Sequence, residues 1–105
     1  MSLIKIKGSV VVPKTVIIAC AVVNAANVLG FTEDMLVTSG NDSTHMQGSK
    51  HYTDEALDFR TKHLTPQQKH ALTTLVKVRL GLDYDVIQEF EGLGNEHLHI
   101  EWDPK

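Results

Sequence analysis

Two separated segments of the chain carry the residue types of a catalytic metal site. The first contains His51 and Asp58, and the second is the run Glu96–His99, in which two histidines follow a carboxylate. Two imidazoles and one carboxylate form a ligand set of catalytic zinc, which keeps a further coordination position open for water. Glu96, three residues before His99, could act as general base toward that water. The pattern therefore predicts a catalytic zinc centre with His51, Asp58 and His99 as its ligands.

The alternation of side chains along two predicted strands places the ligand candidates on one surface. Successive side chains of a strand point to opposite faces of the sheet. In the last predicted strand, His97, His99 and Glu101 share one face and apolar residues occupy the other. In an earlier strand, Asp58 points away from its apolar neighbours. If the two strands are neighbours, Asp58 and His99 meet on the open face of the sheet, and His51 can approach from the preceding loop.

These strands belong to a predicted α+β domain that spans residues 1–105. We expect strands at 3–12, 35–39, 56–60, 84–90 and 97–102, and helices at 13–29 and 66–80. The second helix starts with a capping box at 65–68 and ends at Gly81. The fold expected is a small, mainly antiparallel sheet with the helices packed on one face. The first helix is largely apolar, Cys20 included, so we expect it to be well buried.

Composition and charge exclude several classes of protein. The net charge is −3 and no cluster of Lys and Arg is present, which disfavours nucleic acid as a partner. No apolar run is long enough to span a membrane, and no signal peptide is evident, so we expect synthesis in the cytoplasm. The single cysteine excludes an internal disulfide. The sequence shows no exposed apolar stripe beyond the expected core faces, so it does not predict an oligomeric state.

The two segments resemble the zinc D-Ala-D-Ala carboxypeptidase family, which includes L-alanyl-D-glutamate endopeptidases of phages and bacteria and D-Ala-D-Ala dipeptidases. The family pattern is Ser-x-His-x-x-Gly-x-Ala-x-Asp, followed later by Glu/Asp-x-x-His, commonly within a His-x-His strand. The residues that match this pattern are Ser49, His51, Ala56, Asp58, Glu96, His97 and His99. The resemblance runs from about residue 38 to residue 104 and implies a fold like that of Hedgehog and the D-Ala-D-Ala carboxypeptidases.

The resemblance implies a role for each matching residue. His51, Asp58 and His99 would bind one Zn²⁺, Glu96 would be the general base, and His97 would be a secondary catalytic residue near the scissile carbonyl. Zinc lowers the pKa of bound water to about 7, so a carboxylate can take its proton at neutral pH. The implied substrate is a peptidoglycan stem peptide or a D-amino-acid dipeptide. A phage lysin of this kind would reach the cell wall after release by a holin.

Two positions depart from the family pattern. Asp54 stands where the family has glycine, which adds negative charge beside the predicted metal. Asp42 stands where the family's Ser-Gly-x-Arg loop has an arginine that supports the substrate. His45 and Gln47 on the same loop could donate hydrogen bonds in its place. Together with Ser49 they are the predicted substrate-binding residues.

Two other functions are compatible with the same residues. The chain could be a non-catalytic zinc-binding module on this fold, as the Hedgehog signalling domain is. Alternatively, it could bind no metal, with histidines that respond to pH at the surface and with Asp58 paired to Arg60 or Lys62. Against the module, a structural zinc site usually fills its fourth position with a protein ligand, whereas this pattern supplies three ligands and a spare carboxylate.

Overall fold

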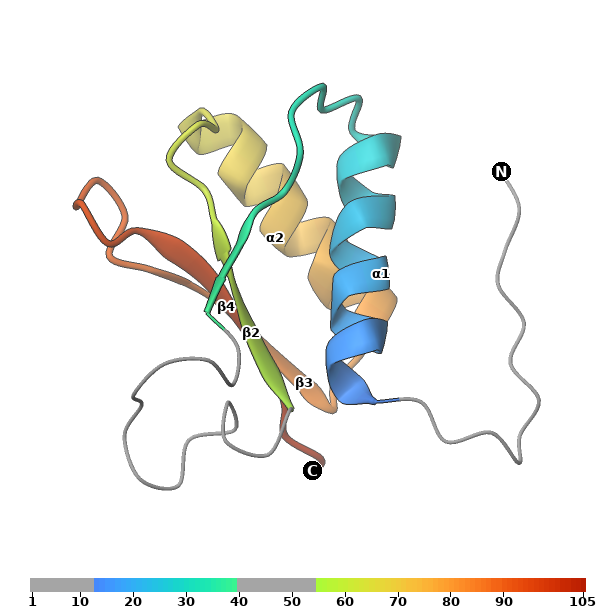
Figure 1. Ribbon diagram of the computed structural model, residues 1–105. Coiled ribbons are helices and arrows are strands. Elements are labelled where there is room, and N and C mark those ends of the chain that lie inside the picture. Colours follow the sequence, from blue (N-terminus) through green and yellow to red (C-terminus); the bar gives the residue numbers. More distant parts are fainter. Residues whose placement is uncertain (1–12, 40–54) are drawn as a thin grey trace.

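In the part of the chain that the structure describes, two helices cover one face of a four-stranded antiparallel sheet (Figure 1). The structure is a computed structural model, and it describes residues 13–39 and 55–105. The elements are α1 (Lys14–Val28), β1 (Val37–Ser39), β2 (Ala56–Arg60), α2 (Pro66–Leu80), β3 (Tyr84–Glu89) and β4 (His97–Trp102). The predicted α+β class with helices on one face is confirmed. The strand expected at 3–12 and the loop at 40–50 lie outside the described residues.

The strand order places the two site-bearing strands in the interior of the sheet. The order is β1-β2-β4-β3, and every neighbouring pair is antiparallel. Strands β2 and β4 are therefore direct neighbours, with Asp58 opposite His99 and Phe59 opposite Leu98. On the other side of β4, Glu89 of β3 is opposite His97. This register sets the relative positions of all the polar side chains on the open face.

The hydrophobic core lies between the helices and the sheet. Its buried residues are Ile18, Val22, Ala25 and Ala26 of α1, Phe59 of β2, Leu64 in the segment between β2 and α2, Leu72 and Val76 of α2, Val86 of β3, and Leu98 and Ile100 of β4. Along β4, buried apolar residues alternate with half-buried polar ones. One face of the sheet is thus committed to the core, and the other is free to carry polar groups.

Helix α1 is buried along one stripe only. Ile18, Val22 and Ala25 are fully buried and follow each other at spacings of four and three residues, as expected for one helix face. Val23 is 51% exposed, and Cys20 is exposed as well. The expectation that α1 is well buried, Cys20 included, was wrong for one side of the helix, because the described residues that pack against α1, from α2 and the sheet, lie on its other side. In the described residues, neither helix has the length and apolar composition needed to cross a membrane.

Local sequence signals explain where several elements begin and end. The predicted capping box of α2 is present: Thr65 Oγ1 accepts from Gln68 N at 3.1 Å, and Gln68 Oε1 accepts from Thr65 N at 2.9 Å. Strand β3 ends at Glu89, one residue earlier than predicted, because Phe90 adopts a left-handed φ of 55°. Gly92 follows with a φ of 82°, so the chain reverses tightly before β4.

Candidate functional site

Asp58 and His99 meet on the open face of the sheet. They lie directly opposite each other on β2 and β4, and Asp58 Oδ1 is 2.7 Å from His99 Nδ1. Only 12% of the Asp58 side chain and 14% of the His99 side chain are exposed. Because β2 and β4 are adjacent, the structure brings together two of the three predicted metal ligands.

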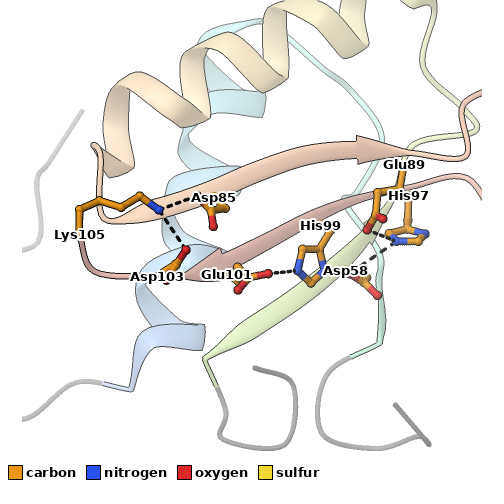
Figure 2. A network of polar contacts seen from close by, with 8 residues as sticks. All are labelled: Asp58, Asp85, Glu89, His97, His99, Glu101, Asp103 and Lys105. Carbon is orange, nitrogen blue, oxygen red and sulfur yellow. Dashed lines mark hydrogen bonds and ion pairs between the residues drawn. The ribbon is translucent and has the colours of Figure 1, made fainter. Parts of the chain in front are cut away.

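His99 has a carboxylate at each of its ring nitrogens (Figure 2). Nδ1 faces Asp58, and Nε2 lies 2.9 Å from Glu101 Oε1 on the same strand. Burial alone would lower the pKa of His99, but the hydrogen bonds to Asp58 and Glu101, and the charges of both, raise it to about 9. In the metal-free protein His99 is therefore an imidazolium at neutral pH and donates a hydrogen bond to each carboxylate.

His97 lies on the same face of β4 with different partners. Its Nδ1 donates to the backbone carbonyl oxygen of Asn95 at 2.8 Å, because a carbonyl can only accept. Its Nε2 is 3.2 Å from Glu89 Oε1 and 3.8 Å from Asp58 Oδ1. The ring of Phe90 lies beside it, with 5.7 Å between ring centroids. His97 thus stands next to the Asp58–His99 pair, held by β3 and by the turn that precedes β4.

Glu96 is held in a buried cluster of hydrogen bonds. Its Oε1 accepts from Lys69 Nζ at 2.7 Å and from Gly92 N at 2.9 Å, and its Oε2 accepts from Thr61 Oγ1 at 2.7 Å. Only 3% of the Glu96 side chain is exposed. Since Lys69 belongs to α2, this contact ties the turn before β4 to the helix layer. Burial alone would raise the pKa of Glu96, but the hydrogen bonds from Gly92, Lys69 and Thr61, with the Lys69 charge, lower it to about 2.

An open pocket of about 410 Å³ borders three of the predicted site residues. It lies near the β1 edge of the sheet and the turn before β4. Its lining residues are Leu36, Thr38, Asp58, Arg60, Lys62, Gly94, Asn95, Glu96 and His97. Two cations, Arg60 and Lys62, therefore line the same pocket as Asp58, which would suit a ligand with a negatively charged group.

The remaining predicted site residues lie outside the described part of the chain. These are the third ligand candidate, His51, and the substrate-binding candidates His45, Gln47 and Ser49. Among residues 13–39 and 55–105, no three His, Cys, Asp or Glu side chains are grouped as a metal site. The described residues thus provide one carboxylate and one imidazole of the predicted zinc site.

The Asp58–His99 pair fits half of a zinc site. Carboxylate oxygen and imidazole nitrogen are both zinc ligands, each at about 2 Å from the metal, so two ligand atoms on one tetrahedral ion lie about 3.3 Å apart. Asp58 Oδ1 and His99 Nδ1 are hydrogen-bonded at 2.7 Å, so a separation of roughly half an ångström more would let both bind one ion. In the metal-free state a proton lies between these atoms, and metal binding releases such protons.

Two residues that contact the predicted site, Glu101 and Lys69, had no predicted role in it. Glu101 was placed on the same face as His99 by strand alternation, and this position is confirmed, but its contact with Nε2 was not foreseen. Lys69 lies three residues before the buried Leu72 and seven before the buried Val76, and so falls on the core-facing side of α2. A lysine at such a position indicates a buried carboxylate partner, which here is Glu96.

Comparison of the chain with protein-family models, with curated proteins and with solved structures finds no match.

Proposed function

We propose that this chain is a zinc-dependent peptidase that hydrolyses peptidoglycan stem peptides or D-amino-acid dipeptides. The bond cut would be of the D-Ala-D-Ala carboxypeptidase or L-Ala-D-Glu endopeptidase type, on a Hedgehog-like fold. In a phage, such an enzyme would be made in the cytoplasm and reach the wall after holin release. The observation that carries the proposal is the contact between Asp58 and His99 on adjacent strands, at the open face of the sheet.

Asp58, His99 and His51 are the residues that would hold the zinc ion. When bound, zinc polarises a peptide carbonyl and supplies a water that is acidic enough to lose a proton at neutral pH. His97 lies on the same face as His99 and borders the pocket, so we assign it to contact with the substrate. Arg60 and Lys62 line that pocket and are suited to hold a carboxylate of the peptide.

Glu96 is the proposed proton acceptor. Its low pKa keeps it ionised at neutral pH, and a carboxylate has about four lone-pair positions, of which three are used here. The same low pKa makes Glu96 a weak base, which limits the driving force for proton transfer. Lengthening of the contact with Lys69 or Gly92 would raise its basicity during the reaction.

The bonding of Glu96 also favours a second candidate function, a non-catalytic zinc-binding module. A carboxylate that accepts from Lys69, Thr61 and Gly92 contributes to the fold whether or not it takes part in chemistry. In such a module, Asp58 and His99 would hold the metal and no peptide bond would be cut. The two functions predict the same zinc content and differ in hydrolysis.

The deciding experiment is hydrolysis of purified peptidoglycan by zinc-loaded protein, with mass spectrometry of the released ends. Wild type should generate new termini that identify the bond, and Glu96→Gln should generate none while retaining zinc. Glu91→Gln is the matched control, because Glu91 is a carboxylate in the same turn with an exposed side chain. It should cleave as well as wild type.

The outcomes separate the two functions. Cleavage by wild type and by Glu91→Gln, but not by Glu96→Gln, supports the peptidase. No cleavage of peptidoglycan or of D-Ala-D-Ala by wild type with one zinc bound supports the module. Absence of zinc from protein purified without a nickel resin, and failure to take it up, would exclude both.

A further inference from the structure

We infer that Glu101 is a positioning residue of the metal centre: by accepting a hydrogen bond from His99 Nε2, it reserves Nδ1 for the zinc ion beside Asp58. The inference rests on the proposed zinc function. It adds a residue to the site and assigns the ring nitrogen through which His99 would bind the metal.

The two nitrogens of His99 face carboxylates of different origin (Figure 2). Nδ1 faces Asp58 of the neighbouring strand at 2.7 Å, and Nε2 faces Glu101 of its own strand at 2.9 Å. An imidazole that binds a metal does so through one nitrogen, while the other keeps its proton and donates it to an acceptor. His99 therefore has a distinct partner available for each task.

Asp58 identifies which side of the ring belongs to the metal. It is the carboxylate of the predicted ligand set, so the ion would lie against Asp58 and against the nitrogen that faces it, which is Nδ1. Nε2 points along β4 toward Glu101. With Nδ1 on the metal, the Nε2 proton has an acceptor already in place.

The position of Glu101 is set by the sheet. Glu101 follows His99 by two residues and shares its face, and its backbone is paired with Ala56 of β2 and Asp85 of β3. Its side chain is 26% exposed, so the contact with Nε2 is partly shielded from solvent. An acceptor held in this way fixes the orientation and tautomer of the ring and makes the ligating nitrogen more basic.

The test is the zinc affinity of wild type, Glu101→Gln and Glu101→Ala, measured by competition with a chelating dye at one pH. Loss of an outer hydrogen-bond partner typically weakens metal binding about 10- to 100-fold. We expect that loss for Glu101→Ala and a smaller one for Glu101→Gln, whose amide oxygen can still accept. Urea unfolding of the metal-free variants shows whether the fold is intact.

Glu89→Gln is the matched control. Glu89 also contacts a β4 histidine from the open face, but its partner is His97, which is not a predicted ligand. The zinc affinity of the Glu89→Gln variant should stay within about twofold of wild type. A loss equal to that of the Glu101 variants would mean that negative charge on this face matters and the specific contact does not, which would overturn the inference.

The remaining outcomes are also decisive. Equal affinity of wild type and both Glu101 variants removes Glu101 from the site and leaves the proposed function standing. Failure of wild type to bind zinc removes the proposed function itself. Nitrogen-15 NMR of the zinc-loaded protein gives an independent readout: His99 should keep its proton on Nε2, and a proton on Nδ1 instead would contradict the assignment.

Discussion

His99 is placed between two carboxylates, and a positive charge between them favours this arrangement. In the metal-free protein the imidazolium of His99 supplies that charge to Asp58 and Glu101. A zinc ion at Nδ1 would take over the role, with the neutral ring still donating to Glu101. At the scale of single residues, the three side chains of Asp58, His99 and Glu101 therefore suit either a proton on His99 or a metal ion at its Nδ1. They would be destabilised if neither were present.

Removal of the Asp58 carboxylate is the most direct test of the ligand assignment. We expect Asp58→Ala to weaken zinc binding by more than about 100-fold, since outer partners alone contribute 10- to 100-fold. Asp85→Asn is the control, because Asp85 also lies on a sheet strand but pairs with Lys105 at 3.1 Å. Stoichiometric zinc in Asp58→Ala, measured by elemental analysis after dialysis, would remove Asp58 from the ligand set.

The buried Glu96 makes stability depend on pH in the acid range. Its pKa is lowered from 4.5 to about 2 in the folded state, so the unfolded chain takes up the proton first as pH falls. The stabilisation is complete above pH 4.5 and is lost between there and pH 2; its upper limit is about 3 kcal/mol.

Urea unfolding of wild type and Glu96→Gln between pH 6 and pH 2.5 measures this effect. Gln cannot ionise, so the variant should lack the part of the pH dependence that belongs to Glu96, and the difference in unfolding free energy should shrink as pH falls. Parallel curves for the two proteins would show that the ion pair with Lys69 does not stabilise the fold.

At the scale of elements, the turn between β3 and β4 positions both Glu96 and His97. Gly92 has a φ of 82°, and its N–H donates to Glu96 Oε1 at 2.9 Å. A side chain at a left-handed position costs roughly 1–2 kcal/mol, so Gly92→Ala should lower the unfolding free energy by about that amount. Gly94→Ala is the control: Gly94 has no positive φ and an added Cβ meets nothing within 4 Å. Urea unfolding should show little change for it.

Element boundaries were predictable where they depend on local interactions. The capping box at Thr65 and the glycine at position 81 set the limits of α2, and both were evident from neighbouring residues. Strand β2 and strand β4 were predicted at their observed bounds. Along β4, buried apolar side chains alternate with half-buried polar ones, whereas along β2 the polar Asp58 is buried together with Ala56 and Phe59. The early end of β3 was missed, because nothing in the local sequence requires Phe90 to adopt a positive φ.

Contacts between distant elements could not be predicted in the same way. The pairing of β2 with β4 was a condition of the site hypothesis, and only the folded chain supplies it. Lys69 and Glu96 are 27 residues apart, and their contact depends on how α2 crosses the sheet. The exposed side of α1, which includes Val23 and Cys20, was missed for the same reason: apolar composition does not reveal how many sides of a helix find a partner.

At the scale of the whole molecule, one core serves both layers, so truncation within it should destabilise the entire fold. Leu98 is fully buried on β4 between the two site histidines. We expect Leu98→Ala to lower the unfolding free energy by about 2–5 kcal/mol, with loss of helix and sheet in one transition. Leu82→Ala is the control, because Leu82 is 88% exposed. Separate melting of the helices and the sheet, followed by circular dichroism, would contradict a shared core.

The strand order has a consequence for the persistence of the site during partial opening. Among residues 13–39 and 55–105, strand β1 has three residues and lies at the edge of the sheet, whereas β2 and β4 are hydrogen-bonded on both sides. Edge segments detach at a lower free-energy cost than interior ones, and their amide protons exchange with solvent sooner. Asp58 and His99 therefore belong to the part of the sheet that opens last, and fluctuations that release β1 leave the two side chains opposite each other.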